Sequence, residues 1–146
     1  MKPRTRARAL ALQVLYEIDV ANHPPAEVFK QRLADTPLTA DLSEFARQII
    51  FGILPITTEL DKIIARYAPD WPFDQVAAID RNILRMACWE IAVYHDTPLK
   101  VVINEAVEIA KKYGSDSASR FINGVLGSLA EHQNEIRQSL QKAGQP

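Results

Sequence analysis

The chain has 146 residues, of which 47% are hydrophobic and 24% are charged, and its formal net charge is −1. This is the length of one globular domain with enough apolar residues for a core, which excludes a disordered chain and a large multidomain enzyme. The five glycines form no phosphate-binding loop or dinucleotide motif, so we expect no nucleotide cofactor. Cys88 is the only cysteine, which excludes an intramolecular disulfide and a cysteine-ligated zinc site and favours a cytoplasmic protein.

Positive charge is concentrated at the start of the chain. Residues 1–8 contain Lys2, Arg4, Arg6 and Arg8 and no acidic residue, so the other 138 residues carry a net charge of −5. A protein that binds nucleic acid without selectivity is usually basic throughout, because phosphate neutralisation supplies most of that affinity. The distribution therefore predicts a selective site or a protein partner. Polar residues interrupt the apolar segment that follows, so we expect neither a signal peptide nor a membrane span.

Apolar residues recur at helical spacing along nearly the whole chain, and no segment alternates as a strand would. In chain order, the pattern predicts helices over about residues 4–21, 25–34, 39–54, 57–67, 80–94, 97–113 and 115–140. We therefore expect an all-α fold, a compact bundle of about seven helices that forms one domain over residues 1–140, with a frayed tail at 141–146. The segment APDWPFD, residues 68–74, is expected to separate two small subdomains.

No residue pattern indicates catalysis or metal binding. The three histidines, His23, His95 and His132, have no partner at the i, i+4 spacing that makes a helical metal pair. Cys88 lies at helical spacing from Leu84 and Ile91, which is typical of a core thiol rather than a nucleophile. We expect a protein that is not an enzyme and holds no metal.

The first helix carries two candidate RNA-binding features. Arg4, Arg6 and Arg8 alternate in what we expect to be a frayed first turn, where guanidinium groups reach phosphates; the alternative is that they only favour solubility. Gln13 and Tyr16 lie three residues apart, outside the apolar stripe of the same helix. Tyr16 there either stacks on an unpaired base or packs against the protein.

A second candidate segment is SRFINGVLG, which contains Arg120, Phe121 and Asn123. A basic residue beside an aromatic one is typical of a surface that stacks single-stranded RNA, although aromatic residues at helical spacing are more often part of a core. Gly124 interrupts a helical pattern, so the sequence predicts either a turn or a glycine needed at a close contact or a functional surface.

Asp80, Arg81 and Arg85 lie in the first two turns of the fifth predicted helix. Arg85 stands between apolar residues, and a half-buried arginine needs a partner. It either contacts RNA or forms a structural ion pair with an acid such as Glu90 or Glu105.

Three motifs together resemble the NusB family of bacterial transcription antitermination factors: RARALALQVLYEIDV, then DRNILRMACWEI, then VVINEAVEIAKKYGSDSASRFINGVLGSL. They stand in the family's order and spacing, and the likeness covers about residues 3–130. The resemblance implies an all-α fold of two small subdomains and no catalytic activity. It also implies binding of the boxA element of nascent ribosomal RNA together with NusE, a small-subunit ribosomal protein, within a complex on RNA polymerase that suppresses premature termination.

The resemblance also assigns roles to individual residues. By this likeness Arg4, Arg6, Arg8, Tyr16, Phe121 and Asn123 face RNA, and Asp80 and Arg81 lie on the surface that faces the protein partner. Some members of the family self-associate and cover the RNA surface, so a homodimer is a further expectation. This chain departs from some relatives by having Thr5 within the arginine run and Trp89 where tyrosine is common.

Two other functions were weighed against this one. The acidic body is compatible with a protein-interaction module that binds a basic partner without recognising RNA. The same helical domain also precedes the catalytic part of a ribosomal RNA cytosine methyltransferase, but only 17 residues follow Leu129, too few for an α/β domain with a cofactor loop.

Overall fold

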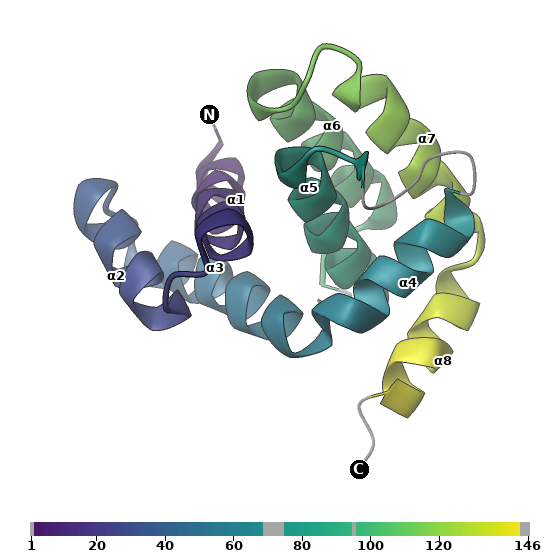
Figure 1. The fold of residues 1–146 in the computed structure, drawn as a ribbon, viewed down its shortest axis with the longest axis horizontal. Helices are drawn as coiled ribbons and strands as arrows, with labels where there is room; N and C mark the ends of the chain where they lie inside the picture. The colour runs from purple at the N-terminus through teal and green to yellow at the C-terminus, as the bar shows by residue number, and fades with distance from the viewer. Residues whose placement is uncertain (1, 69–74, 95, 144–146) are drawn as a thin grey trace.

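The computed structural model describes residues 2–68, 75–94 and 96–143, and this part of the chain is all α-helical (Figure 1). Eight α-helices and two short segments occur in it: α1 (Pro3–Ala21), α2 (Pro25–Asp35), α3 (Ala40–Ile53), the 3₁₀ turn η1 (Leu54–Ile56), α4 (Thr57–Tyr67), α5 (Ala78–Trp89), the π-helical segment η3 (Glu90–Tyr94), α6 (Leu99–Tyr113), α7 (Ala118–Glu131) and α8 (Gln133–Ala143). The predicted all-α fold is confirmed.

The helices form two groups, α1–α3 and α4–α8, which lie on opposite sides of the view in Figure 1. Helix α3 leads into α4 through η1, where Pro55 interrupts the regular hydrogen bonding. The predicted boundary at residues 68–74 lies almost entirely outside the described residues. In the described part, α4 packs on α5, α7 and α8, so the change of group falls at η1 instead.

One hydrophobic core runs through both groups. Helices α1 and α3 both pack on α5, so side chains such as Leu12, Ile50 and Leu84 are fully buried together. Removing one such side chain from water stabilises the fold by roughly 1.5–3 kcal/mol. Among the helices of residues 2–143 that the structure describes, none combines the length and the apolar character that crossing a membrane requires.

The last predicted helix is divided in the structure. Helix α7 ends at Glu131 and α8 starts at Gln133, and the His132 ring between them packs on Tyr67 with its centroid 4.7 Å away. The Gln133 side chain donates a hydrogen bond to the Ile91 carbonyl at 3.2 Å, which ties the start of α8 to η3. The prediction that the chain frays from residue 141 was wrong for residues 141–143, because α8 continues to Ala143. Residues 144–146 lie outside the described part.

Candidate RNA-binding surface

The arginine run at the start of α1 is helical rather than frayed. The helix begins at Pro3, and the Arg6 amide donates to the Lys2 carbonyl at 3.1 Å. Because each helical residue turns by about 100°, Arg4 and Arg8 share one side of α1 and Arg6 lies on the other. Arg6 and Arg4 are exposed, and the Arg4 guanidinium lies 4.4 Å from the centroid of the Phe45 ring on α3, in cation–π contact. These two arginines are available to phosphate groups.

Arg8 does not lie on this surface, because it is only 3% exposed. Its Nε and Nη2 donate to the two Glu90 carboxylate oxygens at 2.9 and 2.8 Å, and its Nη1 lies 3.8 Å from Glu105. Burial disfavours the charge, but the hydrogen bonds and the charge of Glu90 outweigh burial and raise the pKa of Arg8 above its ordinary value. The structure thus contradicts the expectation that Arg8 contacts phosphate, because η3 and α6 cover this turn of α1 and bring Glu90 and Glu105 to the guanidinium.

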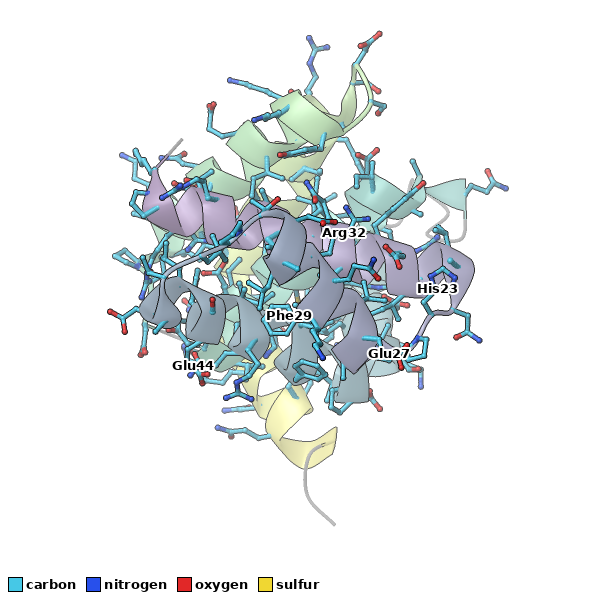
Figure 2. All side chains as sticks on the ribbon, turned by 90° about the vertical axis from the view of Figure 1, so that its left-hand side faces the viewer. His23, Glu27, Phe29, Arg32 and Glu44 are labelled. Carbon is cyan, nitrogen blue, oxygen red and sulfur yellow. The ribbon has the colours of Figure 1, made fainter. Side chains whose placement is uncertain are left out.

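Further along α1, Tyr16 and Gln13 have different surroundings. Tyr16 is 40% exposed, so its ring is open to a partner. Gln13 is half-buried and its carbonyl oxygen accepts a hydrogen bond from Arg32 of α2 at 3.2 Å. Figure 2 shows α2 lying alongside α1, with Arg32 on the side toward it and His23 at the end of α1. Hydrogen bonds from His23 and Arg32 to Glu17 lower the pKa of that carboxyl, so this side of α1 is already paired with neighbouring residues.

The second predicted segment forms the first turns of α7. Arg120 and Asn123 are exposed, and Phe121 is half-buried, packed against the core with part of its ring outside. The turn expected at Gly124 is absent, since α7 is continuous from Ala118 to Glu131. A Cβ atom built on Gly124 would meet no described atom within 4 Å, so packing within this chain does not require glycine there.

The two segments lie at one end of the molecule. In Figure 1 the start of α1 and the connection from α6 to α7 are at the same end. One groove is lined by Lys2, just before α1, and by Lys111 and Lys112 from the end of α6, and the Thr5 hydroxyl of α1 donates to Glu105 of α6 at 2.6 Å, so these elements are in direct contact. The exposed basic residues of α1 and the Arg120–Asn123 turn therefore belong to one end of the protein.

Arg85 is buried in an ion-pair cluster between the two helical groups. Its Nε and Nη2 donate to the two Asp61 carboxylate oxygens at 2.6 and 2.7 Å, and its Nη1 donates to Asp19 of α1 at 3.2 Å. Of the two alternatives for Arg85, the structure has the ion pair, with Asp61 and Asp19 rather than Glu90 or Glu105 as partners. An RNA contact is contradicted because the side chain is only 9% exposed.

The predicted partner-facing pair is divided between surface and interior. Arg81 is partly exposed and bonds Asp19 through Nη2 at 2.8 Å. Asp80 is 4% exposed, which contradicts a place for it on a docking surface. Burial raises the pKa of Asp80 above its ordinary value, although Ser115 donates a hydrogen bond to it at 3.3 Å. A Cβ on Gly114 would lie 2.7 Å from Asp80 Oδ1, so glycine is needed in this turn for space.

Sequence reasoning missed three features of this end of the protein. Glu90, the buried partner of Arg8, is an acid within the apolar run ACWEIAV, which is a signal for a buried ion pair. Phe45, on which Arg4 stacks, is 41 positions further along the chain, and local spacing cannot reveal such a contact. Lys111 and Lys112 stand in the last turn of α6, where basic residues are favourable in any helix, so they give no specific signal for a binding surface.

The described residues contain no group of three or more His, Cys, Asp or Glu side chains that could hold a metal ion. His23 pairs with Glu17, His132 packs on Tyr67, and His95 lies outside the described residues. Cys88 is buried, and burial raises the pKa of its thiol to about 12. A thiol with such a pKa is a poor nucleophile at neutral pH.

Fold and surface together define a class: a small all-helical protein that exposes basic residues at the start of α1, at the end of α6 and at the start of α7. The family profile described as "NusB family" matches residues 5–131. The chain therefore belongs to the NusB family of transcription antitermination proteins, which is not a family of enzymes. The resemblance seen in the sequence is confirmed.

Similar proteins support this assignment over nearly the full length. The "Transcription antitermination protein NusB" of Roseiflexus castenholzii (strain DSM 13941 / HLO8) is 46% identical over 134 residues, which cover 90% of this chain and 94% of the relative. The protein of the same name from Chloroflexus aggregans (strain MD-66 / DSM 9485) is 45% identical over 86% of this chain and 85% of its own.

Solved structures show the same fold. The NusB of T. maritima is 31% identical with a TM-score of 0.83, over 94% of this chain and 98% of its own. A second structure, of antitermination factors NusB and NusE in complex with double-stranded RNA, is 28% identical with a TM-score of 0.81, over 90% of this chain and 98% of its own.

Proposed function

We propose that this antitermination factor binds single-stranded RNA of the boxA type together with NusE, and so suppresses premature termination by RNA polymerase. The observation that supports it most is the solved complex of a 28% identical NusB with NusE and RNA. The RNA there is double-stranded. A single strand is proposed here because the exposed parts of Tyr16 and Phe121 suit stacking on unpaired bases.

The RNA surface in this proposal is smaller than the sequence predicted. It consists of Arg4 and Arg6 on α1, Tyr16 further along that helix, and the turn with Arg120, Phe121 and Asn123 on α7. Arg8 and Arg85 are left out because they are buried in ion pairs, and Gln13 because Arg32 already bonds its carbonyl oxygen. For NusE we retain Arg81, which is partly exposed, and omit the buried Asp80.

Three further parts of the proposal rest on the family resemblance. We infer that the protein works in the cytoplasm, as part of the antitermination complex on RNA polymerase. We also infer that it forms a homodimer in the absence of RNA, with the RNA surface covered. Sedimentation at increasing concentration, with and without RNA, tests the dimer: RNA is expected to shift it toward monomers.

Fluorescence anisotropy tests the main proposal. A labelled boxA RNA and a scrambled RNA are each titrated with the protein alone and with NusE present. The proposal predicts binding of the boxA RNA that NusE strengthens and that the scrambled RNA lacks. Equal, weak binding of both RNAs with NusE bound normally would instead indicate a protein-interaction module.

A further inference from the structure

An open groove lies between the first turn of α1 and the last turns of α6. Its volume is about 560 Å³, and its lining comes from Lys2, Thr5, Glu105, Glu108, Ile109, Lys111 and Lys112. Sites for small molecules commonly have volumes of about 300–1,000 Å³, so the groove is large enough for one nucleotide. None of these seven residues was among the predicted RNA contacts.

The inner part of the groove holds the Glu105 carboxylate, which residues of α1 contact from two sides. The Thr5 hydroxyl donates to Glu105 Oε2 at 2.6 Å, and the guanidinium of the buried Arg8 lies 3.8 Å from the same oxygen. Arg8 is shared between Glu90 and Glu105, so Glu105 keeps part of its negative charge, and the three lysines of the groove must supply its positive charge. Ile109 lines the groove beside it but is only 3% exposed, so the ligand contacts of this groove are polar.

The rim of the groove is basic and contains one free acceptor. Lys2, Lys111 and Lys112 are all exposed. The Lys111 ammonium lies 3.4 Å from Glu108 Oε1, but both side chains are more than half exposed, and such surface pairs are weak. The Glu108 carboxylate thus remains able to accept a hydrogen bond from a ligand.

We propose that this groove seats one nucleotide of the bound RNA, which extends the RNA surface from the start of α1 onto α6. Lys2 and Lys112 would neutralise the flanking phosphates, and Glu108 would accept a hydrogen bond from an amino group of the base. Carboxylates pair with exocyclic amino groups such as N4 of cytosine, and uracil has no such group. The nucleotide in the groove is therefore cytosine, adenine or guanine in preference to uracil.

This inference rests on the proposed function, and its first test removes one charge of the rim. The affinity for a labelled boxA RNA is measured against salt for the wild-type protein, Lys112→Ala and Lys100→Ala. Lys100 is a matched control because it is exposed on the first turn of the same helix, outside the groove. Lys112→Ala is expected to weaken binding several-fold and to reduce the slope of log affinity against log salt by about 0.7. Equal affinities and slopes for the two variants would overturn the proposal.

The second test concerns the choice of base. A set of boxA RNAs, each with one non-uridine position replaced by uridine, is titrated with the wild-type protein and with Glu108→Gln. We expect one position at which uridine weakens wild-type binding several-fold and at which the variant shows a much smaller difference. The same sensitivity to uridine at every position in both proteins would overturn the assignment of Glu108.

The two tests separate failure of this inference from failure of the proposed function. If the wild-type protein binds no boxA RNA with or without NusE, both fail. If it binds and a Phe121 variant weakens binding while Lys112→Ala does not, only the groove is rejected. A loss of NusE affinity in Lys112→Ala at unchanged RNA affinity would show that the groove belongs to the protein partner, and would also overturn the proposal.

Discussion

The arginines of α1 have opposite environments: two are exposed on the surface of the protein and one is buried. At the surface, Arg4 stacks on the Phe45 ring and Arg6 is exposed, so both charges remain available to a ligand. In the interior, Arg8 is held by Glu90 with two hydrogen bonds and is shielded from solvent. Arg4 and Arg8 share one side of the helix, so packing decides between these roles: Glu90 and Glu105 cover the turn with Arg8, while the first turn with Arg4 stays exposed.

The comparison shows that charge in the sequence is not the same as charge at the surface. The buried pair joins α1 to the end of α5, and it holds in place the helix that carries the exposed arginines. The buried arginine therefore stabilises the fold, while the exposed arginines are available to bind RNA. The following experiments test this division, beginning with the largest expected effect.

Breaking the buried pair is expected to have the largest effect. Glu90→Ala leaves the Arg8 charge buried without its partner, which costs about 3–5 kcal/mol of the free energy of unfolding. Urea denaturation measures this loss of stability. The double variant Arg8→Met, Glu90→Met is expected to lose less than Glu90→Ala, since no buried arginine is left without the carboxylate that binds it. Glu44→Ala, which breaks the exposed pair with Arg47, is the control and should change stability little. Equal losses in Glu90→Ala and Glu44→Ala would contradict the division.

On the exposed side, Phe121 is expected to make the largest single contribution to RNA binding. Phe121→Leu keeps an apolar side chain against the core but removes the aromatic face. Loss of stacking on one base weakens affinity by about 1–3 kcal/mol, which is roughly 5- to 150-fold. Anisotropy measures the affinity, and circular dichroism checks that the variant is folded. A folded variant with wild-type affinity would show that Phe121 is only a core residue.

Gly124 allows a test of the open face of α7. Because no described atom approaches its Cβ position, Gly124→Ala is expected to stabilise the protein by up to about 1 kcal/mol through helix propensity. If RNA lies close to this turn, the same change weakens RNA binding. Gly127→Ala, one turn further from Phe121 and equally open, should stabilise the helix without affecting RNA. Thermal unfolding and anisotropy measure the two effects, and unchanged RNA affinity in Gly124→Ala would place the RNA elsewhere.

The salt dependence of RNA binding gives a smaller effect. Arg6→Gln removes one exposed charge, so the slope of log affinity against log salt should decrease in magnitude by about 0.7. Arg66→Gln is the matched control, since Arg66 is an exposed arginine on α4 in the other helical group. An equal change in both variants would mean that the charges act only through the overall field of the protein.

The buried Asp80 is expected to make the stability of the protein depend on pH. Its pKa is raised in the folded protein, so its contribution to stability is greatest below its ordinary pKa of 3.8 and is lost as the pH rises through the folded-state pKa. Asp80→Asn, which stays neutral, should therefore gain stability relative to the wild-type protein between acidic and neutral pH. Unfolding temperatures of both proteins at several pH values measure this difference, and a difference that does not vary with pH would contradict it.

The sequence predicted the exposure of some candidate site residues and was wrong about the exposure of others, for physical reasons. The exposed positions of Arg6, Tyr16 and Arg120 follow from helical periodicity, since all three lie outside the apolar stripes. Arg8 was wrongly placed because its buried partner Glu90 is 82 positions away, and the spacing of the arginines gives no sign of that contact. The Arg85 ion pair was foreseen as an alternative, but its partner Asp61 lies 24 positions away and only folding brings the two together.

The sequence by itself determined the all-α class, the positions of most helices, the content of the core and the likeness to the NusB family. These follow from local periodicity, helix end signals and motif order, which depend on neighbouring residues. The tertiary structure decided which arginines are exposed, where the last helix divides and that a groove forms between α1 and α6. Such features depend on residues far apart in the chain, as Arg8 and Glu90 are at 82 positions, and on how the helices pack. Packing brings those residues together, so it decides whether an arginine is buried in an ion pair or exposed on the surface.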